Sequence, residues 1–412
     1  MSLHSVLPQA PSQHPTSSYV FALKNQTQPT VLNEENFRRP KTLSLQIGGI
    51  AFFAGYSTLG FTVIDINCLP KLFRTLGKLL QLNLLTVGIA IVMMVLAILL
   101  DLVLGDPSPN NPDRWVFKLH PTVLMGNFTK KIEPHFKNPD PKTEKFLGVL
   151  LGLTVIAAFT IPTFLGLWAI YTFLPFYFNI LFYAIIGIIL LKMTICIKLE
   201  TDWAKATAKA IDKADLPEAK KYSHFSRRES KDLNGAQMGS AVIESMSENL
   251  IDFKLSPMMS FALFGVTGAI AFRAINTLDG MVGFKTKEHI NTGWFSANLD
   301  NFVNFIPTRL TALFMIIAAA ILRMDARNAW KMAKRDHKKT PSRNHGWPMA
   351  AVAGALRIQL EKPGQYILAD PLEPVTGDKI LGALRIRDVT IVLWGLLCLG
   401  VIVAVRLFFL PI

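Results

Sequence analysis

Long apolar stretches separated by polar segments dominate this sequence and constrain its fold more than any other feature. A helix needs about 20 mostly apolar residues to cross the hydrocarbon core of a bilayer. The stretches that meet this length most clearly are Leu84 to Leu104, Phe146 to Trp168, Ala169 to Leu191 and Ile391 to Leu410. The second and third follow each other directly, so we expect a hairpin broken near Pro162 or Pro175. The sequence therefore predicts an all-α, polytopic integral membrane helical bundle.

Two further apolar stretches contain residues that are unfavourable in lipid. Leu255 to Ile275 contains Pro257 and Arg273, and Phe305 to Leu322 contains Arg309. Charged side chains at this depth normally pair with one another or face the interior of a bundle. With these stretches included we expect about five to seven membrane segments, and the first of the two is the candidate for a re-entrant segment.

The chain divides into three parts by composition. Residues 1–45 are polar and rich in Pro, Gln, Ser and Thr, which predicts a disordered tail. Residues 46–83 form an extension in which the apolar, glycine-containing segment from Ile47 to Ile66 is a candidate membrane or interfacial segment. Residues 84–412 are expected to form the membrane-embedded domain, with a basic region at about 192–254.

The excess of basic residues indicates how the chain lies in the membrane. The formal net charge is +14, whereas only 17% of the residues are charged and 51% are hydrophobic. In such a composition the positive charges belong in cytoplasmic loops beside anionic lipid, and no nucleic-acid partner is expected. On this rule residues 192–254 and 323–388 are cytoplasmic, whereas residues 276–304, with Lys285 and Lys287 as their only basic residues, lie outside if Leu255 to Ile275 spans. We expect a multi-pass protein of the cell membrane.

One segment carries acidic residues at helical spacing. Glu244, Glu248 and Asp252 recur at every fourth residue, so they share one face of a helix. Like charges at this spacing repel, and a cation, protonation or exposure to water must offset the repulsion. Apolar neighbours such as Val242 and Ile251 favour a packed helix and hence a site. A solvated face ahead of a membrane span is the alternative.

Two more polar segments adjoin apolar helices. Arg273, Asn276 and Asp279 end one apolar stretch, where they either cap a turn or belong to a buried site. Asp300 and Arg309 enter the next apolar helix together. A carboxylate suits a hard cation and a guanidinium suits a phosphate. An internal Asp–Arg pair is the alternative.

Shorter motifs carry less information by themselves. Asn344-His345-Gly346-Trp347-Pro348 leads into a helix rich in small residues, which suits close helix packing, and His345 alone is interpreted as structural. Leu104-Gly105-Asp106-Pro107 closes the first clear span, and His120-Pro121 follows it. The sequence contains no Walker-type loop, no GxGxxG and no HExxH, so the enzymes that those motifs identify are disfavoured. The three cysteines are far apart and predict no thiolate metal site.

Taken in order, these segments resemble the adenosylcobinamide-phosphate synthase family of cobalamin biosynthesis. The resemblance covers roughly Leu96 to the C-terminus. The blocks that carry it are Leu100-Asp101-Leu-Val-Leu-Gly105-Asp106-Pro107, His120-Pro121 with Met125-Gly126, Val242-Ile-Glu244-Ser-Met-Ser-Glu248-Asn249 with Asp252, Arg273-Ala-Ile-Asn276-Thr277-Leu278-Asp279, Leu299-Asp300 with Ile306-Pro307-Thr-Arg309, and Gly346-Trp347-Pro348-Met349-Ala350. The chain departs from the family pattern at Asn127, where Arg is usual, and at Asp300-Asn301, where two aspartates are usual.

The resemblance implies ATP-dependent joining of adenosylcobyric acid, a corrinoid, to an aminopropanol or its phosphate. It implies Mg²⁺, ATP as a substrate, and an active side that faces the cytoplasm; the oligomeric state stays open. The candidate catalytic residues are Glu244, Glu248, Asp252 and Asp279. The candidate metal ligands are Glu248, Asp252, Asp279 and Asp300. The candidate substrate-binding residues are Arg227, Arg228, Arg273, Asn249, Asn276, Arg309, Asn344 and Trp347.

A single site that uses all these residues conflicts with the charge rule above. Residues 276–304 must then reach the same side as Glu244 to Asp252, so we expect the stretch Leu255 to Ile275 to be re-entrant or broken, with Pro257 as the candidate break. Two other functions fit parts of the pattern. An intramembrane prenyltransferase also binds a diphosphate through acidic helices and Mg²⁺, and an ion-coupled transporter also places acids in the membrane.

Overall fold

The structure is a computed structural model that describes residues 45–47, 50–52, 69–108, 113–223 and 233–408. It falls into two units, residues 1–66 and residues 67–412. In the first unit, strands β1 (Leu45–Ile47) and β2 (Ile50–Phe52) pair antiparallel, with Leu45 opposite Phe52. The predicted tail, apart from Leu45, lies outside the described residues. Most of the apolar stretch Ile47 to Ile66 lies outside them too, and its described beginning forms part of this hairpin.

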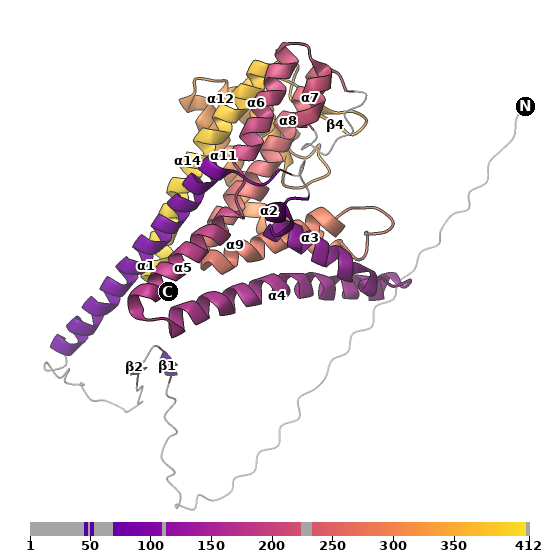
Figure 1. Cartoon of the computed structure of the whole chain (residues 1–412). Coiled ribbons are helices and arrows are strands. Elements are labelled where there is room, and N and C mark those ends of the chain that lie inside the picture. The colour runs from indigo at the N-terminus through magenta and orange to yellow at the C-terminus, as the bar shows by residue number, and fades with distance from the viewer. Residues whose placement is uncertain (1–44, 48–49, 53–68, 109–112, 224–232, 409–412) are drawn as a thin grey trace, which may run out of the picture. The chain divides into compact units, whose positions relative to one another are not determined.

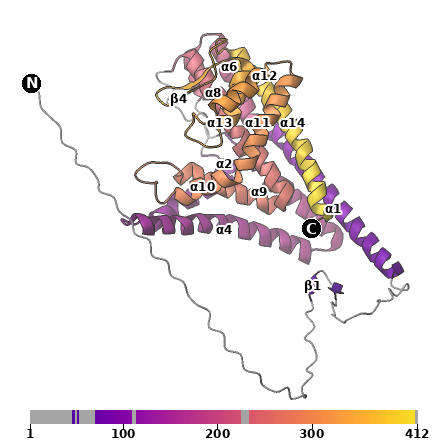
Figure 2. The same ribbon diagram turned by 180° about the vertical axis from the view of Figure 1, so that it is seen from behind.

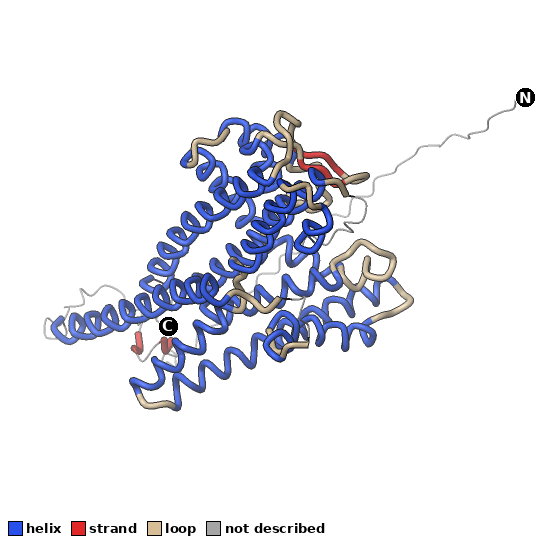
Figure 3. The backbone as a smooth tube through the Cα atoms, turned by 45° about the horizontal axis from the view of Figure 1, so that its top comes forward, coloured by secondary structure: helices blue, strands red, loops and turns tan. Residues whose placement is uncertain are grey.

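The second unit is helical almost throughout (Figures 1 and 3). Its elements up to the acidic segment are α1 (Leu69–Leu104), α2 (Trp115–Lys118), α3 (Pro121–Ile132), η2 (Glu133–Phe136), α4 (Pro141–Phe173), α5 (Phe176–Lys192), α6 (Lys198–Asp212) and α7 (Leu216–Ser223). Then come α8 (Gly235–Leu250), η4 (Ile251–Leu255), α9 (Ser256–Val282), α10 (Trp294–Val303), α11 (Phe305–Ile321), α12 (Ala326–Asp336), α13 (Gly346–Leu356), β3 (Leu360–Lys362), β4 (Tyr366–Leu368) and α14 (Gly377–Phe408).

Several helices of this unit are long and apolar enough to cross a membrane. By length and composition, four helices among the described residues could each cross a membrane. The bent pair α10–α11 would be a fifth span if the two helices cross together. The prediction of an all-α polytopic membrane protein is thereby confirmed. The predicted hairpin breaks at Pro175, since Leu174 before it is extended as proline requires, whereas Pro162 lies inside α4. The expected boundary after Trp168 was wrong, because α4 continues to Phe173.

The acidic segment and the following apolar stretch form one interrupted helix. An Asn234–Gln237 capping box starts α8, and the chain then passes through η4, a single π-helical turn, into α9. Pro257 does not break the helix, because it lies in the first turn of α9 where a missing N–H costs nothing. The break falls at Gly265, whose φ of 69° and ψ of −163° belong to a region open essentially to glycine alone. The stretch Leu255 to Ile275 is therefore broken, but at a glycine.

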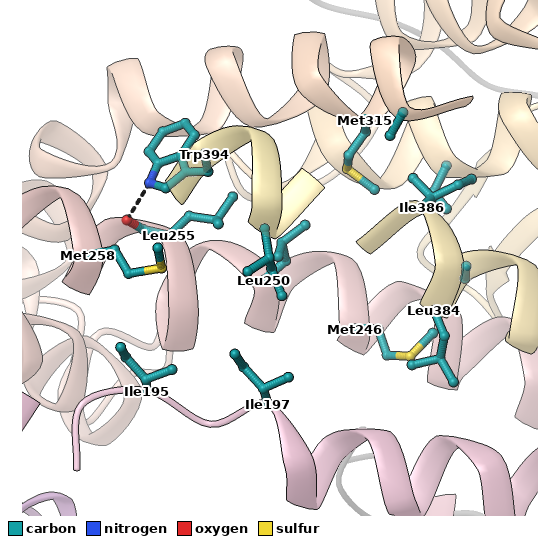
Figure 4. Packing of buried hydrophobic residues seen from close by; sticks show 14 of the residues in the cluster. Ile195, Ile197, Met246, Leu250, Leu255, Met258, Met315, Leu384, Ile386 and Trp394 are labelled. Atoms are coloured by element: carbon teal, nitrogen blue, oxygen red, sulfur yellow. Dashed lines mark hydrogen bonds between the residues drawn. The ribbon is translucent and has the colours of Figure 1, made fainter. Parts of the chain in front are cut away.

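The helices pack around one large apolar core. Helices α1 and α14 run side by side, and within this unit α4 lies at the end away from α6, α7 and α12 (Figures 1 and 2). Residues of α1, α8, α9, α11, α13 and α14 share the core. Figure 4 shows part of it, where the buried indole Nε1 of Trp394 in α14 donates to the carbonyl of Leu255 at 2.8 Å. This bond fixes the end of the π-turn against α14.

The second apolar stretch is bent as well. Helix α10 meets α11 at an angle of 46° across Asn304. The predicted span Phe305 to Leu322 matches α11, but it continues a bent pair instead of crossing alone. As a result, Asp300 near the end of α10 comes close enough to Asp252 of η4 for the two carboxylates to interact electrostatically.

Candidate functional site

Acidic side chains of α8 and η4 form the centre of the candidate site. Glu244 is 4% exposed, and the side chains of Glu248 and Asp252 are 35% and 15% exposed. Their spacing of four residues places them on one side of the helix, as the sequence predicted. The alternative of a fully solvated face is wrong, because Glu244 and the apolar residues around it are buried.

The π-turn that carries Asp252 is held by groups from elsewhere in the chain. A π-turn widens the helix and leaves carbonyls without their usual partners. Arg273 Nη1 donates to the carbonyl of Asp252 at 3.1 Å, and the backbone N–H of Cys196 donates to the carbonyl of Phe253 at 3.0 Å. Trp394 Nε1 donates a hydrogen bond to the carbonyl of Leu255. The position of Asp252 therefore depends on tertiary contacts.

A buried ion cluster with partners in α6 and α14 holds the π-turn η4 in place. Lys254 is fully buried, and its Nζ lies 2.8 Å from Glu200 Oε2 of α6. Arg387 of α14 contacts the same Glu200 oxygen at 3.0 Å and also donates to Thr201. Breaking a buried pair of this kind leaves an uncompensated charge and costs about 3–5 kcal/mol. No local sequence pattern marks these three charged residues.

His345, at the start of α13, faces the acidic residues. Its Nε2 lies 3.5 Å from Asp252 Oδ1, and its Nδ1 lies 3.9 Å from Glu248 Oε1. Burial alone lowers the pKa of His345, but the charges of Asp252, Glu248 and Asp300 outweigh burial and raise the pKa to about 10. At neutral pH this imidazole is a cation within the acidic cluster. The interpretation of His345 as merely structural overlooked this contact, which no local spacing could reveal.

Asp300 of α10 joins the cluster from a second direction. Its side chain is buried and accepts two hydrogen bonds from Asn304 Nδ2, each of 3.2 Å. Asn304 Oδ1 in turn accepts from Ser256 Oγ at 2.7 Å. Electrostatic interactions connect Asp300 with Asp252, Asp279 and His345. The bend between α10 and α11 thus brings a distant carboxylate beside η4.

Helix α9 contributes Arg273, Asn276 and Asp279. Arg273 is buried, and besides the carbonyl of Asp252 it contacts Asn276 Oδ1 at 3.2 Å and Thr122 Oγ1 of α3 at 3.2 Å. The carboxylate of Asp279 lies against Gly283, where a Cβ would approach its Oδ1 to 2.1 Å. A glycine is required at that position for steric reasons. Arg273 thus ties α9 to η4, and Asp279 interacts electrostatically with Asp300. The roles of these three residues in the site stay predictions.

Arg309 and Asn344 form a second polar contact at its edge. Arg309 Nη1 donates to Asn344 Oδ1 at 2.9 Å, and Asn344 Nδ2 donates to the carbonyl of Asn301 at 2.9 Å. The Arg309 guanidinium also lies 3.6 Å from the centre of the Phe305 ring. The expected alternative of an Asp300–Arg309 pair is not what forms, since Asp300 bonds to Asn304.

Four of the predicted substrate-binding residues remain, and the structure describes two of them. Arg227 and Arg228 lie outside the described residues. Trp347 stacks on His337, with ring centroids 3.9 Å apart, and lies 6.0 Å from the Arg309 guanidinium. Asn249, the next predicted ligand, contacts Ser245 at 3.2 Å. Their proposed roles in substrate binding stay predictions.

The acidic set suits a magnesium ion that arrives with a nucleotide. Within the described parts of the chain, no three His, Cys, Asp or Glu side chains are placed to hold a metal ion by themselves. Mg²⁺, however, usually takes only one or two protein carboxylates and completes its shell with phosphates and water. Glu248, Asp252, Asp279 and Asp300 supply oxygen ligands of the right kind. Their role as metal ligands stays a prediction.

A second buried charged cluster lies where α1 and α5 end. Lys192 is buried between Asp101, whose Oδ1 is 3.2 Å away, and Asp106. His120 Nε2 lies 3.8 Å from Asp106 Oδ1. Burial raises the pKa of Asp106, but the neighbouring His120 and the charge of Lys192 outweigh it, so the pKa lies below its usual value. The sequence motifs at Asp106 and His120 therefore meet in space.

Comparison with known proteins assigns the family. The family model described as "CobD/Cbib protein" matches residues 94–393. A probable cobalamin biosynthesis protein CobD of Methanothermobacter thermautotrophicus is 36% identical over 313 residues, which is 76% of this chain and 98% of that protein. The cobalamin biosynthesis proteins CobD of Dehalococcoides mccartyi and Pelobacter propionicus are 33% and 32% identical, over 97% and 95% of their lengths and 76% of this chain in each case. No solved structure matches. This membrane-embedded chain thus belongs to the CobD/Cbib family of cobalamin biosynthesis proteins.

Proposed function

We propose that this protein joins the free carboxylate of adenosylcobyric acid to an aminopropanol or aminopropanol phosphate in an ATP-dependent ligation. Its product is adenosylcobinamide or its phosphate. The single observation that carries this proposal is the convergence of Glu248, Asp252 and Asp300 on the His345 cation. Family membership supports the pathway. It favours this function over a prenyltransferase or a transporter.

The chemistry requires an activated carboxylate. An oxygen of the corrinoid carboxylate attacks the γ-phosphorus of ATP, so a C–O–P linkage forms and ADP leaves. The amine nitrogen, after losing a proton, then attacks the carbonyl carbon; a C–N bond forms, the C–O bond breaks and phosphate departs. Catalysis of phosphoryl transfer consists mostly of positioning and charge stabilisation, and acidic and basic side chains provide both.

Each part of the cluster has a role in this scheme. Glu248 and Asp252 are the candidates to accept the proton that the amine loses, because both lie at the partly exposed side of the cluster. Asp279 and Asp300 would hold Mg²⁺ together with them, and the bound ion would neutralise phosphate charge. Arg273 and Arg309 are the candidates for binding phosphate or carboxylate groups of the substrates.

Reconstitution of the full reaction tests the proposal. We expect the purified full-length protein, with ATP, Mg²⁺, adenosylcobyric acid and aminopropanol phosphate, to release phosphate only when all four are present. We expect phosphate to be released in equal amount to the new amide, which mass spectrometry quantifies. Phosphate release without amide, or no product with any of the amines tested, would refute the proposed reaction.

A matched pair of variants tests the site. Glu248→Gln keeps the shape of the side chain and removes its charge, so we expect at least about a hundredfold loss of kcat, the usual effect of removing an acid–base group. Glu218→Gln makes the same chemical change on α7, where the carboxylate pairs with the exposed Lys221, and should retain activity. Full activity of Glu248→Gln would remove Glu248 from the catalytic machinery.

We also propose that the site faces the cytoplasm and that the protein resides in the cell membrane. The basic residues of α6, α7 and α12 support this orientation, since such loops favour the cytoplasmic side. ATP is available on that side.

A further inference from the structure

The buried cluster at Asp106 and His120 lines a cavity to which the proposed reaction assigns no role. The cavity has a volume of about 740 Å³. Apolar residues of α1 and α5 form part of its wall, and the charged or titratable side chains that line it are Arg114, Asp106, His120 and Lys192. The volume is ample for a small phosphorylated molecule.

His120 is poised to bind a ligand in this cavity. The residue is 9% exposed, and its Nε2 has no hydrogen-bond partner among the residues described. The nearest acidic oxygen, Asp106 Oδ1, is 3.8 Å away, which is beyond hydrogen-bond distance. Buried polar atoms normally find a partner, so an orphaned ring nitrogen in a cavity wall indicates a missing ligand.

The charge balance of the cavity favours an anion. Lys192 contacts both aspartates of the cluster. Asp101 does not line the cavity, and it also accepts the backbone N–H groups of Ile197 and Lys198 at the start of α6. Among the described residues, Asp106 is the one acidic group in the wall; Lys192 pairs with it, and Arg114 adds a further positive charge.

The start of α3 adds to this positive character. His120 is the N-cap residue of α3 and Pro121 is its first helical residue. The N–H groups of the first turn have no acceptor within the helix, and they carry the positive end of the helix dipole. An anion at such a position gains both hydrogen bonds and charge stabilisation.

We propose that this cavity is a phosphate-binding site, in which His120 and Arg114 bind the phosphate group of a small phosphorylated ligand. The phosphate belongs either to a phosphorylated amine or to a nucleotide. Thr122, two residues after His120, accepts a hydrogen bond from Arg273, which also contacts Asp252. The cavity is thus joined to the acidic cluster through α3. Its use in ligation rests on the proposed function, whereas phosphate binding does not.

Binding measurements on the full-length protein in detergent, without corrinoid, test this site. The probes are inorganic phosphate, aminopropanol phosphate, free aminopropanol and ATP, and calorimetry gives the Kd of each. We expect a phosphate-bearing probe to bind, and free aminopropanol to bind more weakly than its phosphate if the amine is the source. The source of the phosphate is identified by the probe whose binding becomes weaker in the variants described below.

Three variants make the test specific. His120→Leu and Arg114→Gln should each weaken binding of that probe by about tenfold or more, the effect of losing one charge-assisted hydrogen bond. Lys118→Gln removes a neighbouring exposed cation that pairs with Asp113 and does not line the cavity, so its Kd should equal that of the unmodified protein. Arg114 is exposed, so we expect Arg114→Gln to fold and to allow the binding measurement even if His120→Leu does not fold.

The outcomes separate this site from the proposed reaction. Failure of every phosphate-bearing probe to bind, or equal binding by all three variants, would overturn the phosphate site. Binding that is lost in His120→Leu and Arg114→Gln, together with no amide product in the full assay, would keep the phosphate site and refute the ligation.

Discussion

The His345 cation provides the sharpest test of the site. Replacing His345 by Gln removes the positive charge between Asp252 and Glu248, which lie 3.5 and 3.9 Å from the ring nitrogens. No side-chain capping bond is lost, because His345 makes none at the start of α13. The effect on stability therefore reports the charge itself.

The magnitude follows from the pKa. The pKa of His345 is about 10 in the folded protein, against about 6.5 in an unfolded chain, and each pH unit of difference corresponds to about 1.4 kcal/mol. The pairing is therefore worth up to about 5 kcal/mol, in line with the 3–5 kcal/mol that breaking a buried ion pair usually costs.

The pH dependence has a defined sign. Between pH 6.5 and 10 the folded protein holds a proton on His345 that the unfolded chain has lost, so this stabilisation falls by about 1.4 kcal/mol per pH unit as the pH rises. It is fully present below about pH 6.5. We expect the stability gap between the unmodified protein and His345→Gln to be largest at pH 6.5 and to shrink steadily toward pH 9.5.

Unfolding by SDS titration in mixed micelles at a series of pH values measures this gap. His337→Gln is the matched control, since His337 is near in the fold and its ring stacks on Trp347. That variant should lose stacking energy by an amount that does not follow the same slope. A gap for His345→Gln that stays constant from pH 6.5 to 9.5 would refute the assignment of a charged His345.

The remaining predictions concern the broken helix, the ion pairs of the buried Asp336 and the membrane topology. Gly265→Ala should destabilise the protein by about 1–3 kcal/mol because of its backbone conformation, whereas Gly166→Ala, in an open part of α4, should be neutral or stabilising; equal effects in SDS unfolding would contradict the break. Burial raises the pKa of Asp336, but hydrogen bonds, first among them that from Arg335, outweigh it and lower the pKa to about 2. Stability from Asp336 should therefore be intact above about pH 3.8 and fall as the pH drops toward 2, and it should be absent in Asp336→Asn. Lys285→Cys in a cysteine-free background should react with an impermeant thiol reagent from the cytoplasmic side, and labelling only from outside would exclude a cytoplasmic position for that loop.

Much of the site was visible in the sequence because it depends on local spacing. The helical repeat of Glu244, Glu248 and Asp252 places them on one face in any α-helix, and the structure retains that face through the π-turn. Arg273, Asn276 and Asp279 were likewise recognised as too polar for a lipid-facing helix end. Their partners were not recognisable, because a contact such as Arg273 to Thr122 joins residues 151 positions apart.

Other features lay beyond sequence reasoning. His345 looked like a lone histidine, and only the packing of α13 against α8 shows that it neutralises carboxylates on that helix and in η4. Lys254 and Glu200 form a buried ion pair between η4 and α6, and no periodic pattern in the sequence predicts this pair. The break at Gly265 was expected at Pro257, because a proline is the usual reason for a broken helix; a proline in a first turn is harmless, and a glycine at positive φ is not replaceable.

The sequence by itself determined that the chain is an all-helical membrane protein, because apolar length and low charge are sums over residues and need no geometry. It also indicated the family, because six blocks of residues follow one another in the family's order, and such an order needs no geometry to be recognised. The tertiary structure alone decided how those blocks meet. Beyond the two breaks, at Gly265 and at Asn304, Arg273 of α9 contacts the backbone of η4, and Asp300 of α10 interacts with Asp252 there. The physical reason is that charges buried in a membrane protein must find partners, and those partners are supplied by packing and not by neighbours in sequence.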